Sequence, residues 1–241
     1  MSGTFGTGGA EPYRDMLTTE FGGPLVLRRF DGESAEISID AARWMQTATA
    51  ADISALEGAA APLLDIGCGP GRMVRAAAGR SVAALGIDVS EDAVALTGAD
   101  GTPVLKRSVF DRLPLEGTWG TIHLMDGKIG IGGDPVTLLE RCAALLAPHG
   151  SVVVEADPDG MLFERATYVT VDERGNESGP FPWARVGHEM IAGLIAQAGL
   201  GIARTWQANG RYFVSARRRE VSSTAAAAAP STAHTDPSPS A

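Results

Sequence analysis

The chain has 241 residues, a formal net charge of −9 and a pI near 4.9. This acidic balance argues against a nucleic-acid partner and against an anionic membrane surface. The sequence contains no apolar run of about 18 residues and no charged-then-apolar leader, so we expect a cytoplasmic protein without a membrane span or signal peptide. Cys68 and Cys142 lack the number and spacing of a disulfide framework or metal site, so no metal is expected.

The two ends of the chain differ in composition from its middle. Residues 1–10 are rich in glycine, serine and threonine, and residues 222–241 in alanine, serine and proline. Such segments bury too little apolar surface to offset the entropy lost on ordering. We therefore expect a flexible N-terminus over residues 1–20, one domain over residues 21–218, and a disordered tail over residues 219–241.

Short apolar runs alternate with amphipathic stretches through the middle of the chain. In chain order they predict strands at 62–66, 82–89, 103–108, 119–125 and 151–156, and helices at 72–78, 90–98 and 134–146. Strands that are apolar on both faces and alternate with helices are typical of a parallel sheet covered by helices on both sides. Right-handed crossovers make such an α/β sheet doubly wound.

Three further segments depart from this alternation. Residues 21–58 form an N-terminal cap with an amphipathic stretch at 40–50, and the alternating residues of 161–182 predict an inserted hairpin that turns at 172–175. After a last helix at 185–198, strands at 201–207 and 212–216 are joined at Asn209-Gly210, which favours a tight turn. We expect this antiparallel hairpin to close an otherwise parallel sheet.

A glycine-rich segment, Asp65-Ile66-Gly67-Cys68-Gly69-Pro70-Gly71, follows the first of these strands and precedes a helix. Glycine tolerates positive φ and lets a ligand approach where a Cβ would collide, and the helix N-terminus adds free amide donors. A dinucleotide site has the spacing Gly-x-Gly-x-x-Gly, whereas Arg72 holds the third glycine position here. The spacing, with Asp65 ahead of it, favours S-adenosylmethionine over NAD. A tight turn without a ligand is the alternative.

Carboxylates follow the next three strands. Asp88 can accept hydrogen bonds from the two hydroxyls of a ribose, or can cap a helix. Asp111, after Phe110, can accept a hydrogen bond from the exocyclic amine of adenine, or can cap a turn. Asp126, followed by Gly127, can hold the amino group of the cofactor, face the substrate or stabilise a loop.

These motifs resemble those of class I S-adenosylmethionine-dependent methyltransferases, closest to an actinobacterial subgroup of mostly uncharacterised members. The motifs are Leu-Asp-Ile-Gly-Cys-Gly-Pro-Gly-Arg, Gly-Ile-Asp-Val-Ser, Phe-Asp-Arg-Leu-Pro and Asp-Gly-Lys-Ile-Gly. The resemblance covers about residues 24–216. It implies a Rossmann-like sheet of seven strands, mostly parallel with an antiparallel C-terminal strand. Two residues depart from the family pattern: Lys128, where relatives tend to have asparagine, and His149, where glycine is usual.

The resemblance also implies a set of site residues. Asp65, Gly67, Gly69 and Gly71 would line the methionine end of the cofactor, Asp88 its ribose and Asp111 its adenine. The complete predicted cofactor-binding set is Asp65, Gly67, Cys68, Gly69, Gly71, Asp88, Val89, Phe110, Asp111, Asp126 and Gly127.

No residue stands out as a catalytic base. His123 lies within an apolar strand and is expected in the core, so Asp126 and His188 are the candidates. A sulfonium is already an activated leaving group, so alignment of the acceptor with the methyl group can be the main contribution of the enzyme. A base is needed only where the acceptor must lose a proton.

We expect a small-molecule acceptor, bound by residues 20–58, the loop 127–134 and the segment 157–184 with Phe181 and Trp183. One alternative function is a cofactor-binding module without transferase activity. Another is an NAD-dependent oxidoreductase of the short-chain type, but no tyrosine has lysine four residues on, as that class would need. The acceptor, the atom methylated and the oligomeric state stay open.

Overall fold

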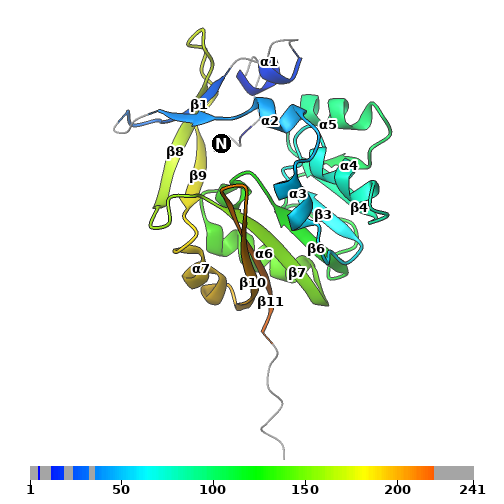
Figure 1. Ribbon diagram of the computed structural model, residues 1–241. Coiled ribbons are helices and arrows are strands. Elements are labelled where there is room, and N and C mark those ends of the chain that lie inside the picture. The colour runs from blue at the N-terminus through cyan, green and yellow to red at the C-terminus, as the bar shows by residue number, and fades with distance from the viewer. Residues whose placement is uncertain (1–4, 6–11, 19–23, 33–35, 220–241) are drawn as a thin grey trace, which may run out of the picture.

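A seven-stranded sheet with the order β10-β11-β7-β6-β3-β4-β5 forms the centre of the computed structural model (Figure 1), which describes residues 5, 12–18, 24–32 and 36–219. The strands are β3 (Leu63–Ile66), β4 (Ala84–Asp88), β5 (Val104–Lys106), β6 (Trp119–Leu124), β7 (Leu146–Ala156), β10 (Leu200–Ala208) and β11 (Arg211–Arg218). Strands β3 to β7 pair in parallel, whereas β11 is antiparallel to both β7 and β10. The predicted doubly wound sheet with an antiparallel last strand is confirmed. Asn209 and Gly210 have φ of 48° and 76°, as their tight turn requires.

Helices cover both faces of this sheet because its strands alternate apolar side chains between the faces. They are α3 (Ala50–Ala55), α4 (Arg72–Ala78), α5 (Glu91–Gly98), α6 (Pro135–Leu145) and α7 (Ile191–Gln197). Leu64 and Val152 pack in the same core as α6 and α7, whereas Leu63 and Val153 pack with α3 and α4. Ser90 and Asp134 accept backbone amides at the N-termini of α5 and α6, which fixes where those helices begin.

A second sheet of four strands, with the order β2-β1-β8-β9, lies beside the first (Figure 1). Its strands are β1 (Leu25–Arg29), β2 (Ile37–Ile39), β8 (Phe163–Val171) and β9 (Phe181–Val186). The predicted inserted hairpin is β8 with β9, and β1 of the N-terminal cap pairs with β8. The sequence did not predict this pairing, because the two partners are far apart along the chain.

Several predicted boundaries differ from those in the structure. The helix predicted at 185–198 begins only at Ile191, because Arg185 and Val186 pair with β8 as the end of β9. The strand predicted at 151–156 begins at Leu146, so His149 lies within β7 rather than in a turn. The amphipathic stretch 40–50 is not one helix: α2 (Ala42–Met45) ends before Thr49, which caps α3.

The N-terminal segment predicted to be flexible includes a helix, α1 (Pro12–Thr18). Its Tyr13, Met16 and Leu17 are buried and pack with Leu25 and Trp44, so this segment gains the apolar contacts that its sequence alone did not indicate. The predicted tail, apart from Arg219, lies outside the described residues. Among the helices described, none is long and apolar enough to cross a membrane.

Candidate functional site

The carboxyl ends of β3, β4 and β6 carry the predicted site residues. The chain runs outward from β3 through β4 to β5, then returns to the other side of β3 as β6. Loops diverge at such a reversal of strand order and leave a crevice, where open α/β sheets bind ligands. The fold therefore brings Gly67, Asp88 and Asp126 to the edge of one crevice.

The three glycines of the loop after β3 all have positive φ, of 65°, 52° and 81° at Gly67, Gly69 and Gly71, but they face different surroundings. A Cβ on Gly67 would meet the side chain of Lys128, and one on Gly69 the hydroxyl of Tyr13. A Cβ on Gly71 would lie 2.5 Å from Cγ2 of Thr97 on α5. Gly71 therefore allows two helices to pack closely, while Gly67 faces the crevice.

Asp88 links this loop to the end of β4. Its Oδ2 accepts a hydrogen bond from the amide of Gly69 at 2.8 Å, and its Oδ1 accepts one from the amide of Ser90 at 2.9 Å. Burial raises the pKa of Asp88, and the backbone donors oppose this rise. A carboxylate oxygen has about two lone pairs, so Asp88 keeps acceptor capacity for a ligand.

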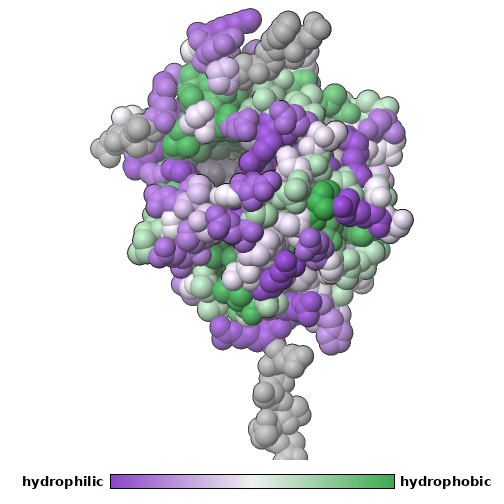
Figure 2. Space-filling view, viewed as in Figure 1, coloured by the Kyte–Doolittle hydropathy of each residue, from purple (hydrophilic) through white to green (hydrophobic). Residues whose placement is uncertain are grey.

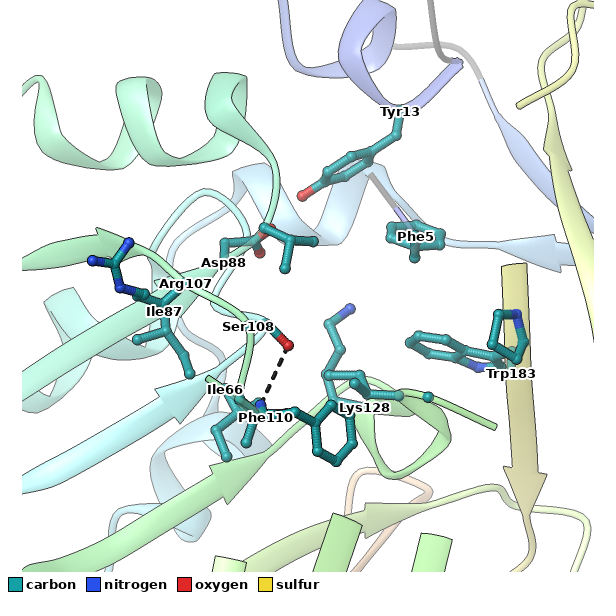
Figure 3. Close-up of a pocket in the computed structure, with 16 residues that line it drawn as sticks. Phe5, Tyr13, Ile66, Ile87, Asp88, Arg107, Ser108, Phe110, Lys128 and Trp183 are labelled. Carbon is teal, nitrogen blue, oxygen red and sulfur yellow. Dashed lines mark hydrogen bonds between the residues drawn. The ribbon is translucent and has the colours of Figure 1, made fainter. Parts of the chain in front are cut away.

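An apolar cavity of about 200 Å³ opens beside Asp88 (Figure 3). Its lining includes Ile66, Gly67, Ile87, Asp88, Val89, Ser108, Val109, Phe110, Lys128, Ile131 and Trp183, together with Phe5 and Tyr13. The structure therefore places the predicted Val89 and Phe110 at one cavity. Asp111 does not line it: its carboxylate accepts the amide of Ser108 at 3.1 Å, so it caps the turn after β5.

A small recess lies at the glycine loop, and its lining includes Asp65, Gly67, Cys68, Gly69, Arg72 and Asp126, together with Tyr13, Trp44 and Lys128. Burial, together with the nearby charge of Asp126, raises the pKa of Asp65 to about 7, although Arg72 and Lys128 oppose the rise. Burial also raises the pKa of the Cys68 thiol. Its sulfur packs where a side chain on Gly86 would lie, so the thiol fills space between the loop and β4.

Asp126 is held by arginines that the sequence did not point to. Its carboxylate pairs with Arg43, with Nη2 of Arg72 at 2.5 Å and with Nη2 of Arg211 at 3.4 Å. Burial alone would raise its pKa, but these guanidinium groups and the ammonium group of Lys128 keep it below its usual value. Asp52 and Glu155 complete the cluster by pairing with Arg72 and Arg211. Arginines spread over distant segments give no local pattern that could have identified this network.

A third cavity, of about 260 Å³, lies between the two sheets. It is lined by Leu27, Ile39, Asp40, Arg43, Trp44, Asp126, Gly127, Ile129, Glu155, Asp157, Trp183, Arg185 and Val186, among others. Figure 2 shows the surface hollowed on this side, between β9 and α2. Trp183 lines both this intersheet cavity and the apolar cavity, and Trp44 lines both this cavity and the recess. Phe181, predicted with Trp183, instead packs with Leu27 and Tyr168.

Aromatic side chains cover the crevice, and we call Phe5, Tyr13, Trp44 and Trp183 the aromatic cap. The first three belong to the N-terminal region and were not identified from the sequence, whereas Trp183 was predicted. The ring of Phe5 lies 5.0 Å from that of Tyr13 and 5.7 Å from that of Trp183. Burial, and then the charge of Asp88, raises the pKa of Tyr13 well above its usual value, so its hydroxyl stays protonated.

No histidine among the residues that the structure describes lines these cavities. His188 lies between β9 and α7 and stacks on Tyr212, with ring centroids 3.8 Å apart, and it does not line any of the three cavities. His123 is buried in β6, as predicted, with Nε2 3.2 Å from the carbonyl oxygen of Ala55. Burial lowers the pKa of His123 to about 4, so the ring is neutral and Nε2 donates.

Comparisons with known proteins agree with this geometry. A family model described as a methyltransferase domain matches residues 41–188, more than half of the chain. No curated protein matches. The fold is similar to that of a Bacteroides fragilis S-adenosylmethionine-dependent methyltransferase solved with S-adenosyl-L-homocysteine (TM-score 0.70, 17% identity, 86% of this chain and 92% of that chain).

Two further solved structures have the same fold. One is CalS10, an amino pentose methyltransferase from Micromonospora echinaspora (TM-score 0.53, 18% identity, 74% of this chain and 95% of that chain). The other is the Burkholderia thailandensis 1,6-didemethyltoxoflavin-N1-methyltransferase (TM-score 0.53, 16% identity, 73% and 80%). The family match, with the glycine loop and sheet that such a domain requires, decides the assignment. The chain therefore belongs to the family of methyltransferase domains, and its fold is similar to that of an S-adenosylmethionine-dependent methyltransferase.

Proposed function

We propose that this enzyme binds S-adenosylmethionine along the carboxyl ends of β3 and β4 and transfers its methyl group to a small molecule held in the intersheet cavity. The observation that carries this proposal is that the intersheet cavity shares a lining residue with each of the other two cavities. Trp183 lines both the apolar cavity and the intersheet cavity, and Trp44 lines both the recess and the intersheet cavity. A donor on one side of these rings and an acceptor on the other would meet at the rim between them.

The chemistry of the lining fits each part of the donor. The apolar side chains Val89 and Phe110 suit the faces of an adenine ring, and the free lone pairs of Asp88 suit ribose hydroxyls. Gly67 leaves room for the methionine end above the backbone. The carboxylate of Asp65 suits the amino group of that end. Asp111 and Gly71, which lie outside the lining of these cavities, would act through the loop conformation instead.

S-adenosylmethionine, when bound, supplies a methyl group on a positively charged sulfur. The residues of this chain would orient the acceptor and exclude water, which can supply much of the rate enhancement of a reaction with an activated leaving group. The arginine cluster holds Asp126 at the rim of the intersheet cavity, so we propose Asp126 as a positioning residue. His188, stacked on Tyr212, receives no catalytic role in this proposal.

The intersheet cavity also suits a small acceptor. Its volume of about 260 Å³ is slightly below the range of about 300–1,000 Å³ usual for small-molecule sites. Its walls combine the apolar Leu27, Ile129 and Trp183 with the charged Arg43 and Asp157. Two proteins of similar fold are described as acting on an amino pentose and on 1,6-didemethyltoxoflavin. Membership of an actinobacterial subgroup remains a prediction.

Calorimetry with S-adenosyl-L-homocysteine tests the donor site. We expect wild-type protein to bind one equivalent, and Gly67→Ala to abolish binding because its Cβ projects into the crevice. Gly101→Ala is the matched control: Gly101 has a similarly strained φ of 82°, but nothing lies within 4 Å of its Cβ position. No binding by wild-type protein at millimolar ligand, or equal loss in both variants, would contradict the proposal.

Transfer itself is tested by incubation with S-adenosylmethionine and a panel of amine, sugar and aromatic acceptors, with mass spectrometry of the products. We expect one acceptor class to gain a methylene mass. Leu27→Trp, which fills the intersheet cavity, should abolish that product and leave binding of S-adenosyl-L-homocysteine intact. Equal activity in this variant would mean that the acceptor binds elsewhere.

A further inference from the structure

Lys128, one of the residues that depart from the family pattern, crosses the part of the crevice above the glycine loop. It begins the short 3-10 helix η1 (Lys128–Gly130), directly after β6 and the Asp126-Gly127 turn. Its Cδ and Cε each lie 3.0 Å from the position of a Cβ on Gly67. Its side chain points into the crevice and lines both the apolar cavity and the recess (Figure 3). The space that Gly67 leaves open is therefore filled by a side chain of the same protein.

The ammonium group of Lys128 is held by aromatic faces. Its Nζ lies 4.8 Å from the ring centroid of Trp44 and 5.6 Å from that of Phe5. Both distances are within the range of about 6 Å over which an aromatic ring attracts a cation. In the part of the chain that the structure describes, no carboxylate pairs directly with this ammonium group. Its charge nevertheless acts on Asp65 and Asp88. This is an aromatic site for a cation, with carboxylates nearby.

The methyl donor carries the same kind of charge. Its sulfonium is a cation, and in the proposed binding mode its methionine end crosses Gly67, where the stem of Lys128 lies. Two chains of atoms cannot fill one space, and two cations close together in a dry crevice repel each other. If a side chain must move out of a site before a ligand can bind, only the protein molecules in which it has moved can bind. The apparent affinity is then the intrinsic affinity multiplied by that fraction.

We propose that Lys128 is an internal competitor of the methyl donor: its ammonium group holds the aromatic cation site that the sulfonium takes on binding. This inference rests on the proposed function, because it assumes the donor position described above. Competition between two charges differs from steric overlap alone, because it depends on the charge of the ligand. Lys128 should weaken the binding of cationic ligands more than that of S-adenosyl-L-homocysteine, whose sulfur is neutral.

Two variants separate the charge of Lys128 from its bulk. Lys128→Met keeps an unbranched apolar side chain but removes the charge, and Lys128→Ala removes both. Calorimetry would measure S-adenosylmethionine, sinefungin, which has an amine-bearing carbon in place of the sulfonium, and S-adenosyl-L-homocysteine. We expect Lys128→Met to bind the two cationic ligands at least about threefold tighter, the effect of one exposed cation–π contact, with a smaller gain for S-adenosyl-L-homocysteine. Lys128→Ala should bind all three more tightly.

Lys106, the other lysine in the sequence, offers a matched control. It lies at the end of β5, pairs with Glu91 at 2.6 Å and is half exposed. Lys106→Met changes the net charge by the same amount, and we expect it to leave all three affinities unchanged. Thermal unfolding without ligand checks that each variant is folded. If one of the two Lys128 variants does not fold, the other still tests the inference.

The possible outcomes separate this inference from the proposed function. Absence of S-adenosyl-L-homocysteine binding by wild-type protein and by both Lys128 variants contradicts the proposed function and this inference with it. Binding by wild-type protein that both variants leave unchanged or weaken overturns the inference alone. An equal gain for charged and neutral ligands in Lys128→Met overturns the role of the ammonium group. A larger gain for the cationic ligands supports the competition.

Discussion

The carboxylate of Asp88 accepts a hydrogen bond from the backbone amide of Gly69, with the two atoms 2.8 Å apart. One residue therefore shapes the glycine loop after β3 and also presents the proposed acceptor for a ribose. We expect Asp88→Ala to weaken binding of S-adenosyl-L-homocysteine by more than about tenfold, or about 1.4 kcal/mol, and to lower the melting temperature.

Asp88→Asn distinguishes these two roles. Its single carbonyl oxygen can satisfy only one of the two backbone donors, Gly69 or Ser90. We expect intermediate stability and intermediate affinity, measured by thermal unfolding and calorimetry. Unchanged affinity in Asp88→Ala would mean that the ribose lies elsewhere.

The raised pKa of Asp65 predicts that donor binding depends on pH near neutrality. Burial and the charge of Asp126 raise the pKa of Asp65 to about 7, and the amino group of the donor would bind only the ionised form. We expect affinity for S-adenosyl-L-homocysteine to rise between about pH 6 and 8, and Asp65→Asn to remove most of this rise. Calorimetry at both values checks this, and an equally steep rise in the variant would contradict the assignment.

The raised pKa of Asp65 also predicts how the stability of the folded protein depends on pH. Between the ordinary value of 3.8 and about 7, the folded state holds a proton that the unfolded state has lost, so unfolding becomes easier as pH rises through this range. Asp65→Asn, which cannot ionise, should gain melting temperature relative to wild type at about pH 8 and much less at about pH 4. Equal differences at both pH values would contradict the raised pKa.

Arg72 bridges the carboxylates of the buried Asp52 and the largely buried Asp126. Its side chain is 3% exposed and pairs with Asp52, which is fully buried, and with Asp126. Removing one partner of a buried ion pair leaves uncompensated charge, so we expect Arg72→Met to lose about 3–5 kcal/mol in urea unfolding. Arg204→Met is the control, because Arg204 is half exposed and its pair with Glu57 should contribute at most about 1 kcal/mol. Similar losses in both variants would mean that the cluster does not stabilise the fold.

Gly86 and Cys68 are coupled by close packing under the glycine loop. A Cβ on Gly86 would lie 2.6 Å from the sulfur of Cys68, so we expect Gly86→Ala to cost about 1–3 kcal/mol by overpacking. Removing the sulfur in Cys68→Ala opens that space, and the double variant should regain most of the loss. A double-mutant cycle by urea unfolding measures the coupling, and additive losses would refute it.

Local signals carried much of the site prediction. The loop from Gly67 to Gly71 and the Asn209-Gly210 turn depend on backbone conformations that glycine and asparagine tolerate within a few residues. Asp88 was predicted from its place at the end of a strand. Asp111 has the same kind of place but caps its own turn, because a short carboxylate can bond either a ligand or a nearby amide.

Long-range contacts explain the remaining differences. The sequence suggested that 185–198 was one helix, whereas pairing with β8 draws Arg185 into β9. In the aromatic cap Phe5 contacts Trp183 as well as Tyr13, although Phe5 and Trp183 are far apart in the chain. Periodicity and spacing describe only neighbours along the chain, so they could not reveal these contacts.

The sequence by itself determined the class of the protein: a doubly wound sheet with a glycine loop and carboxylates at the strand ends, which together predicted a methyl donor. Strand alternation, turn chemistry and spacing are local properties, so they can be read along the chain. Only the tertiary structure decided what surrounds the crevice: the arginines around Asp126, the second sheet behind the intersheet cavity, and the ammonium group of Lys128 over Trp44. Those features depend on which distant residues meet when the sheets pack, and packing is a property of the whole fold.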